Sequence, residues 1–168
     1  LLTAAAGGVG LIACQWLRAL GANVIGTVGT AEKGEIARAN GCDHVILYRD
    51  ENIPEKVRKI TDGAMCAVAY DSVGADTFEP SILSLAPRGM MVTFGNASGP
   101  VEPMSPLVLA KNGSLFLTRP RVGDYYATPE DTMEGIAAVF GMIMDGHIRP
   151  HIGGRYDLAD VSDAHRAL

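Results

Sequence analysis

The sequence has no excess of positive charge and few aromatic residues. Its 168 residues include 14 Lys and Arg against 19 Asp and Glu, and only 6% are aromatic. A nucleic-acid-binding surface needs a basic stripe, and single-strand binders add aromatic platforms for the bases. We therefore expect no nucleic acid as a partner. Hydrophobic residues make up 48% of the chain, enough for one globular domain with a sizeable core.

The longest stretch without a formal charge, residues 1–17, lacks the features of a membrane segment or a signal peptide. It contains Gly7, Gly8 and Gly10, is shorter than the roughly twenty apolar residues that cross a bilayer, and has no basic start. We therefore expect no membrane association. The chain begins at Leu1, in what resembles the end of a strand, which suggests a piece of a longer protein.

Cysteine is scarce and shows no disulfide or zinc pattern. Cys14, Cys42 and Cys66 are far apart and odd in number, and no Cys-x-x-Cys pair occurs. Cys14 and Cys66 lie among small apolar residues, which favours buried packing over reactivity. Reduced cysteines are typical of the cytoplasm, where we expect the protein.

No metal site is predicted from the histidines. His147 and His151 are four residues apart, but Pro150 between them breaks a helix and no nearby side chain completes a ligand set. We expect ordinary loop histidines. Four methionines in apolar stretches are expected in the core: Met90, Met91, Met142 and Met144.

Several catalytic motifs are absent. The sequence has no G-x-x-x-x-G-K-[ST] phosphate loop and no G-x-S-x-G nucleophile elbow. None of its five tyrosines is followed four positions later by lysine, the pair used by short-chain dehydrogenases. These absences argue against phosphate-loop nucleotide hydrolysis, the commonest serine hydrolases and the short-chain dehydrogenases.

The sequence does contain a regular alternation of strand and helix patterns. Strands are predicted over residues 1–3, 22–28, 44–48, 66–71, 88–94 and 115–118. Helices are predicted over residues 11–20, 31–40, 54–61, 77–85, 129–146 and 160–168. The alternation predicts right-handed crossovers and a doubly wound α/β domain with a parallel six-stranded sheet, a Rossmann fold.

The alternation stops beyond residue 119. Thr128 before Pro129, with Asp131 three residues further on, predicts the start of a longer helix. We therefore divide the chain into a nucleotide-binding domain, residues 1–128 with a truncated first strand, and a C-terminal helix and tail, residues 129–168.

The strongest functional signal is Ala5-Ala6-Gly7-Gly8-Val9-Gly10, a G-x-G-x-x-G variant with alanine in the first place. It follows a predicted strand and begins a predicted helix. Small residues allow the tight turn, the close approach of a diphosphate and the packing of helix on sheet. The motif therefore predicts dinucleotide binding, against the alternative of a purely structural turn.

The end of the second strand favours NADPH over NADH. An NAD-binding domain normally carries Asp or Glu there for the ribose hydroxyls. Here the positions hold Gly29 and Thr30, and Lys33 follows one helical turn later, where its ammonium group can pair with a 2′-phosphate. Glu32 complicates this prediction, because its carboxylate could point at the ribose instead or face water.

Five motifs in order resemble the NADPH-binding domain of the quinone oxidoreductases, the zeta-crystallin-like branch of the medium-chain dehydrogenase/reductase superfamily. The resemblance covers essentially the whole chain. The motifs are Ala4-Ala5-Ala6-Gly7-Gly8-Val9-Gly10, Ile25-Gly26-Thr27-Val28-Gly29, Tyr70-Asp71-Ser72-Val73-Gly74, Gly95-Asn96-Ala97-Ser98-Gly99 and Ser114-Leu115-Phe116-Leu117-Thr118-Arg119-Pro120.

The resemblance implies which residues bind NADPH. The diphosphate would lie on Ala6, Gly7, Gly8 and Val9. The 2′-phosphate would lie among Gly29, Lys33 and Tyr48, with Thr30 beside them, although Tyr48 is equally explained as an aromatic residue at a strand end. The nicotinamide side would be lined by Gly74, Phe94, Gly95, Asn96, Leu117 and Thr118.

The resemblance also implies an activity, hydride transfer from NADPH to a quinone, enone or related electron-poor carbonyl without zinc. A GroES-like domain that forms most of the substrate pocket would lie outside this chain, so catalytic residues are expected there and the chain alone is expected to be inactive. The edge strand at residues 114–118 implies a homodimer. The alternatives are a zinc-type alcohol dehydrogenase or enoyl reductase of the same superfamily, and a non-catalytic NADPH-binding protein.

Overall fold

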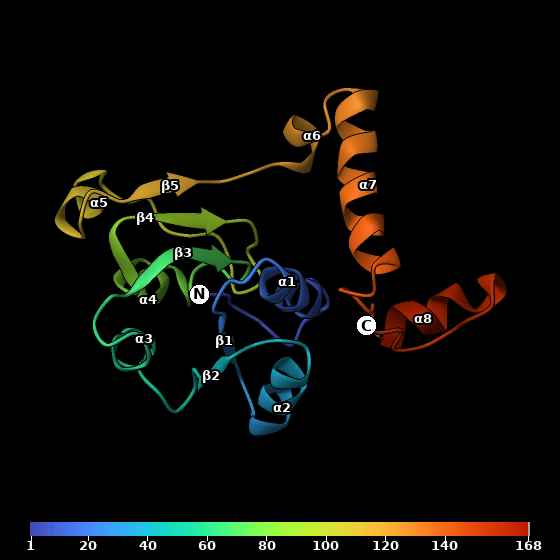
Figure 1. The fold of residues 1–168 in the computed structure, drawn as a ribbon, viewed down its shortest axis with the longest axis horizontal. Helices are drawn as coiled ribbons and strands as arrows, with labels where there is room; N and C mark the ends of the chain where they lie inside the picture. Colours follow the sequence, from blue (N-terminus) through green and yellow to red (C-terminus); the bar gives the residue numbers. More distant parts are fainter. Residues whose placement is uncertain (168) are drawn as a thin grey trace.

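A parallel β-sheet organises the first two-thirds of the chain (Figure 1). The structure is a computed structural model that describes residues 1–167. The strands are β1 (Ile25–Val28), β2 (His44–Leu47), β3 (Cys66–Asp71), β4 (Leu85–Thr93) and β5 (Phe116–Thr118). β1 pairs with β2, β3 with β4, and β4 with β5, and all three pairings are parallel.

Leu2 joins the two parts of this sheet. It forms parallel bridges with Gly26 of β1 and Tyr70 of β3. Its N–H donates to the carbonyl oxygen of Ile25 at 2.9 Å, and its own carbonyl accepts from the N–H of Thr27 at 2.9 Å. The spatial order is therefore β2, β1, the strand at Leu2, β3, β4 and β5, as in a doubly wound α/β fold. The predicted Rossmann fold is confirmed.

Helices cover both faces of the sheet. They are α1 (Gly8–Ala19), α2 (Ala31–Ala39), α3 (Ile53–Ile60), α4 (Phe78–Leu83) and α5 (Leu107–Lys111). One buried cluster joins Val28 of β1 to Cys14 of α1 and Ala37 of α2. The other joins Ile25, on the opposite face of β1, to Val57 of α3. This two-sided cover buries all four residues of β1.

Two boundaries around β4 differ from the predicted ones. The helix predicted over 77–85 ends at Leu83, because the chain enters β4 at Leu85. β4 starts earlier than the predicted residue 88 because its register against β3 shifts, and Arg88 within it has a positive φ of 62°. The extra residues form an irregular first half of the strand, which the apolar pattern of 88–94 does not reveal.

The C-terminal part extends away from the sheet (Figure 1). It comprises α6 (Val122–Tyr125), α7 (Pro129–Met144), the 3₁₀ turn Leu158–Asp160 and α8 (Val161–Ala167). α7 begins with the predicted cap, in which the hydroxyl of Thr128 accepts from the N–H of Asp131 at 3.1 Å and the Asp131 carboxylate accepts from the N–H of Thr128 at 3.2 Å. The last helix was predicted to reach Leu168, which lies outside the described residues.

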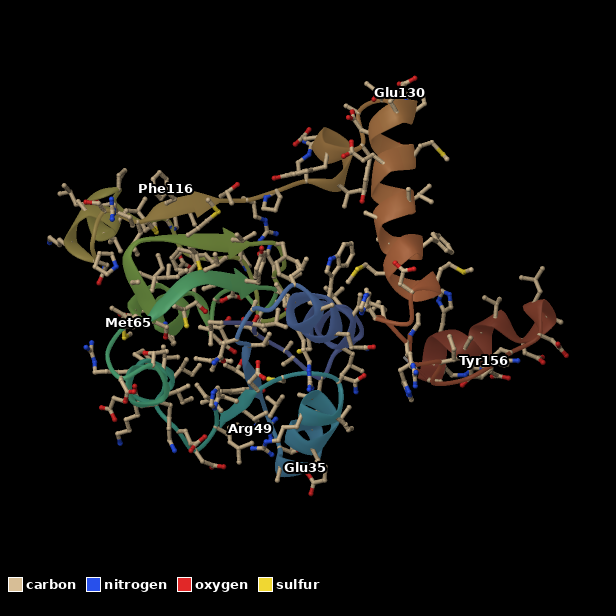
Figure 2. The ribbon with its side chains drawn as sticks, in the orientation of Figure 1. Glu35, Arg49, Met65, Phe116, Glu130 and Tyr156 are labelled. Carbon is tan, nitrogen blue, oxygen red and sulfur yellow. The ribbon has the colours of Figure 1, made fainter. Side chains whose placement is uncertain are left out.

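No residue of α7 is buried. The core positions predicted for Met90, Met142 and Met144 are wrong, since Met90 and Met144 are 41% and 83% exposed and Met142 is only partly buried. Met91 is fully buried as predicted. Tyr156, in the segment before α8, also lies on the periphery of the molecule (Figure 2). An apolar pattern predicts a helix correctly here, but it does not show what covers that helix.

The loop after α7 returns to the sheet and docks on α1. Ile148 is 1% exposed. The N–H of Arg149 donates to the side-chain oxygen of Gln15 in α1 at 2.7 Å. This contact between residues far apart in sequence holds the loop after α7 against α1.

A buried carboxylate organises the loop between β3 and α4. Asp71 is fully buried and accepts hydrogen bonds from the N–H groups of Val73 at 2.8 Å and Gly74 at 3.0 Å. It also accepts from the hydroxyls of Thr77, at 2.8 and 2.7 Å, and Ser81, at 2.9 Å. One side chain thus fixes the end of β3, the following turn and the first turns of α4.

We predict that Asp71→Ala lowers the free energy of unfolding by at least about 2 kcal/mol, because buried donors lose their acceptor. Urea denaturation followed by circular dichroism measures this loss. Asp76→Ala, an exposed carboxylate in the same loop, is the matched control and should change stability by about 0.5 kcal/mol or less. Equal midpoints for the two variants would contradict the role assigned to Asp71.

Candidate nucleotide-binding site

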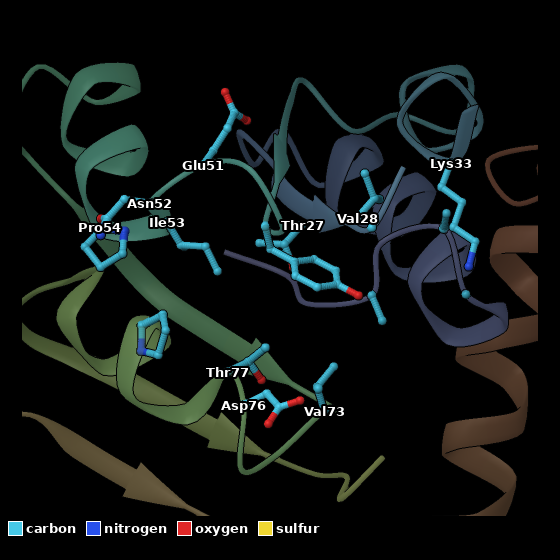
Figure 3. Close-up of a pocket in the computed structure, with 16 residues that line it drawn as sticks. Thr27, Val28, Lys33, Glu51, Asn52, Ile53, Pro54, Val73, Asp76 and Thr77 are labelled. Carbon is cyan, nitrogen blue, oxygen red and sulfur yellow. The ribbon is translucent and has the colours of Figure 1, made fainter. Parts of the chain in front are cut away.

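A cavity of about 410 Å³ opens at the carboxyl ends of β1, β2 and β3 (Figure 3). It lies between segments 4–7, 27–33, 48–54 and 73–80, which follow the central strand, β1, β2 and β3. Lys33 lies at one end, and Asn52, Ile53 and Pro54 lie at the other. The crossovers diverge from the central strand at this place, which is where doubly wound sheets bind their ligands.

The glycine turn leaves the start of α1 open to a ligand. Gly7 precedes the helix with an extended backbone, φ −79° and ψ 172°, and no side chain caps the first turn. The first intrahelical bond runs from the N–H of Leu11 to the carbonyl of Gly7 at 2.9 Å. The N–H groups of Gly8, Val9 and Gly10 therefore point out of the helix end, where its dipole favours an anion.

The three glycines of the turn differ in what surrounds them. A Cβ on Gly10 would lie 2.4 Å from the carbonyl oxygen of Ala4, so only glycine lets α1 pack this closely on the central strand. A Cβ on Gly7 would lie 3.2 Å from the same oxygen. A Cβ on Gly8 would meet nothing within 4 Å. The backbone at Gly8 thus borders open space, as a bound diphosphate requires.

Gly29, Lys33 and Tyr48 all line the cavity, and Lys33 lies at one end of it (Figure 3). The Tyr48 hydroxyl would lie 3.0 Å from a Cβ on Gly29, so a side chain at position 29 would force the tyrosine to move. Thr30 caps α2, since its hydroxyl accepts from the N–H of Lys33 at 3.3 Å. An ammonium group and a phenol hydroxyl are donors suited to a phosphate.

Glu32 does not line the cavity. Hydrogen bonds from its own N–H and from the side chain of Thr30 lower the pKa of this exposed carboxyl group. The carboxylate therefore interacts with the first turn of α2, outside the cavity that Lys33 lines.

The cavity contains five of the predicted site residues and leaves nine outside. Those that line it are Ala6, Gly7, Gly29, Lys33 and Tyr48. Gly8, Val9 and Thr30 adjoin it in sequence. The residues predicted for the nicotinamide side do not line it and lie at the ends of β3, β4 and β5: Gly74, Phe94, Gly95, Asn96, Leu117 and Thr118.

These strand ends are nevertheless linked to one another. A Cβ on Gly95 would lie 2.1 Å from the carbonyl oxygen of Ser72, so the loops after β3 and β4 touch through backbone. Arg119, after β5, donates to the hydroxyl of Thr93 at 3.1 Å and to the carbonyl of Gly95 at 3.0 Å. The loops after β3, β4 and β5 therefore form one continuous edge beside the cavity.

The sequence analysis missed several residues that line the cavity: Thr27, Asn52, Ile53, Pro54, Val73, Asp76, Thr77 and Pro80. All lie at or just after the carboxyl end of a strand or in the first turns of the next helix. The positions after every predicted strand were a usable signal, because the carboxyl ends of parallel strands meet at one edge of the sheet.

The cysteines are buried and free, as predicted for Cys14 and Cys66. A hydrogen bond between the Cys14 and Cys42 thiols, together with burial, raises the pKa of Cys14.

His147 and His151 lie outside helices and strands, as predicted. Among residues 1–167, no three His, Cys, Asp or Glu side chains gather as a metal-ligand set. Over the same residues, no helix is both long and apolar enough to cross a bilayer.

The strand order, the open glycine turn and the cavity at the switch point define a dinucleotide-binding α/β domain. The sequence pattern of the zinc-binding dehydrogenase family matches residues 8–139, and the chain belongs to this family. Its description names zinc, but the residues described here do not fit a zinc site, because no ligand set is brought together.

The relatives include quinone oxidoreductases and a 2-haloacrylate reductase. The chain is 49% identical to the quinone oxidoreductase of Pseudomonas aeruginosa over 168 residues, covering 100% of this chain and 52% of the relative. It is 41% identical to the 2-haloacrylate reductase of a Burkholderia species over 169 residues, covering 100% of this chain and 51% of that protein. The chain thus spans about half the length of the curated relatives it matches.

Solved structures of these kinds of proteins are also similar to the chain. The quinone oxidoreductase of Escherichia coli in complex with NADPH matches with a TM-score of 0.87 at 47% identity, over 90% of this chain and 47% of that one. The 2-haloacrylate reductase structure matches with a TM-score of 0.95 at 41% identity, over 98% and 52%. The resemblance inferred from the five motifs is confirmed.

We predict opposite effects for alanine at two glycines of the turn. Gly10→Ala should lower the free energy of unfolding by about 2 kcal/mol or more, because its Cβ has no room beside the Ala4 carbonyl. Gly8→Ala should be neutral or slightly stabilising, since alanine favours the helix over glycine. Thermal melts compare the two, and a neutral Gly10→Ala would mean that α1 can shift away from the central strand.

Proposed function

We propose that this chain is the NADPH-binding part of a zinc-independent quinone oxidoreductase that transfers hydride from NADPH to a quinone or related electron-poor carbonyl. The observation that carries the proposal is that Lys33 and Tyr48 line the cavity with Gly29 and offer an ammonium group and a phenol hydroxyl, while Glu32 does not line it. The quinone oxidoreductases among its relatives, one of them solved with NADPH at 47% identity, support it.

The residues of the glycine turn would hold the diphosphate. The N–H groups of Gly8 and Val9 lie at the positive end of α1. Ala6 and Gly7 line the approach from the central strand, and the N–H of Gly7 donates to the Ala4 carbonyl at 2.9 Å. The ammonium group of Lys33 and the hydroxyl of Tyr48 would bind the 2′-phosphate. The open space at Gly8 and the absence of an acidic residue from the first turn of α1 fit this ligand.

The nicotinamide would lie along the edge formed by the loops after β3, β4 and β5, on Gly74, Phe94, Gly95, Asn96, Leu117 and Thr118. Bound NADPH supplies the hydride. This chain would orient the ring and exclude water from one side of it, while the acceptor is held by the remainder of the protein. Glycine at positions 74 and 95 keeps these loops in backbone contact, since a Cβ at either would lie within 2.5 Å of a carbonyl oxygen.

The acceptor would be an electron-poor small molecule, a quinone or an enone. The 2-haloacrylate reductase among the relatives favours including activated carbon–carbon double bonds in this class. Neither a nucleic acid nor a membrane is proposed as a partner. The three free cysteines are compatible with a reducing compartment, and we propose the cytoplasm.

The division at residue 128 is part of the proposal. α7 has no buried residue and carries Met133, Ile136 and Phe140 on its surface, with exposures of 62%, 43% and 60%. We propose that residues 129–168 return toward a GroES-like domain that completes the substrate pocket. Apolar residues left uncovered on a helix of this length favour a covering partner.

The cofactor preference is tested by reversing the charge of Lys33. The unmodified chain should bind NADPH more tightly than NADH, and Lys33→Glu should lose at least about tenfold of this preference, because a phosphate dianion then faces a carboxylate. Fluorescence titration with each nucleotide measures it. Lys59→Glu, the same change on an exposed residue of α3 outside the cavity, is the control. An unchanged preference in Lys33→Glu would remove the phosphate role.

The homodimer is proposed through the free edge of β5. Phe116 and Leu117 on this strand are 58% and 40% exposed, and Phe116 lies at the outer margin of the sheet (Figure 2). Phe116→Asp should convert a dimer into a monomer in light scattering coupled to size exclusion, because a buried charge opposes strand pairing. Val122→Asp, at an apolar residue that is 74% exposed and lies off the strand, is the control. A monomeric unmodified chain at high concentration would count against the dimer.

A further inference from the structure

One buried hydroxyl at the cavity has no hydrogen-bond partner. Thr27 is 1% exposed, and within residues 1–167 its hydroxyl oxygen is the only buried side-chain nitrogen or oxygen without one. A buried hydroxyl that loses its bonds to water and gains none destabilises the fold. Such a group requires an explanation, because valine would fill the same volume without this cost.

The neighbouring buried hydroxyls are all satisfied. Thr3, on the adjacent central strand, accepts from the N–H of Ser72 at 3.0 Å. The hydroxyls of Thr77 and Ser81 donate to the carboxylate of Asp71. The polar groups at this end of the sheet are thus paired with one another, and Thr27 is the exception.

Thr27 also lies in the cavity in which a nucleotide would bind. It is one of the residues that line the cavity (Figure 3). Gly7 of the glycine turn also lines the cavity. The side chains of Ile53 and Pro54 form an apolar wall in the far part of the cavity, away from Lys33. A phosphate at Lys33 and a flat base against the apolar wall would leave the sugar and base edge of an adenosine over Thr27.

We propose that the Thr27 hydroxyl is a binding group for the adenosine half of the cofactor, left without a partner in the empty cavity and paired when the nucleotide binds. This inference rests on the proposed function and adds a residue to its site. Rotation about χ1 by one staggered well is the adjustment that turns a threonine hydroxyl toward a ligand. The Thr27 hydroxyl thus contributes a hydrogen bond to the affinity of the protein for the adenosine half of the cofactor.

The proposal predicts that Thr27→Val stabilises the protein without nucleotide and destabilises its complex with nucleotide. Removing an unpaired buried hydroxyl should raise the melting temperature of the empty chain. The same change removes a hydrogen bond from the complex and should weaken nucleotide binding by about threefold to tenfold. A threonine that only fills space would give the rise in melting temperature with no change in affinity.

The experiment uses the 168-residue chain and isothermal titration with 2′,5′-ADP, which carries the adenosine and its 2′-phosphate without nicotinamide, and with NADPH. Thr27→Val should weaken both, whereas Thr27→Ser keeps the hydroxyl and should bind within about twofold of the unmodified chain. Thr93→Val is the matched control. Thr93 is a buried threonine at the end of β4 whose hydroxyl accepts from Arg119 at 3.1 Å, and it does not line the cavity.

Thr93→Val should lower the melting temperature and leave the affinity for 2′,5′-ADP unchanged. Equal affinity of Thr27→Val and the unmodified chain for 2′,5′-ADP would overturn the role of Thr27 while the proposed function stands. Weakened binding of NADPH alone, with 2′,5′-ADP unaffected, would place the contact outside the adenosine half and also overturn it. If the folded, unmodified chain binds neither ligand, the proposed function fails, and the role of Thr27 with it.

Discussion

The hydrogen bonds of the short strand at Leu2 are the interaction on which the remaining structure depends. On one side it exchanges bonds of 2.9 Å with the backbone of Ile25 and Thr27. On the other, the carbonyl of Leu1 accepts from Tyr70 and the N–H of Thr3 donates to Tyr70, at 2.9 and 3.0 Å. The pair β1–β2 and the set β3–β4–β5 touch through this strand. Because the connections leave it in opposite directions, the loops at its carboxyl end separate and a cavity opens there.

Close backbone packing around the same strand then determines the shape of the site. A Cβ on Gly26 would lie 2.6 Å from both the Ala5 Cβ and the Cys42 sulfur, and one on Gly10 would lie 2.4 Å from Ala4. Small residues at these points bring α1 onto the sheet, and its N-terminus comes to the edge of the cavity. Neighbouring glycines of the turn thus have different roles: Gly10 allows close packing, and Gly8 leaves room for a ligand. The two roles can be told apart only when the space around each glycine is known.

Local patterns in the sequence predicted the helices, strands and turns more accurately than they predicted how these elements pack against one another. The glycine turn, the cap at Thr128 and the strand at residues 66–71 were correct because each depends on a few adjacent residues. The irregular start of β4 was not predicted, since it arises from a register shift against β3. The exposure of Met144 and the burial of Ile148 were not predictable either, because both depend on where the C-terminal segment packs.

The residues of the candidate site also fall into those that the sequence indicated and those that only the structure revealed. Lys33 was found from its place one helical turn after the second strand, and Tyr48 from the resemblance to a family. No rule of spacing shows that residues from these two separate crossovers line one cavity. Thr27 had no signal at all, since a threonine in a strand is ordinary and only the contacts around it show that its hydroxyl is unpaired. By itself the sequence determined the fold class, the glycine turn and the family, because apolar periodicity and turn residues act over short distances. Only the tertiary structure decided which loops meet, which polar groups are satisfied and which are left for a ligand, because hydrogen-bond partners and burial depend on residues far apart in the chain.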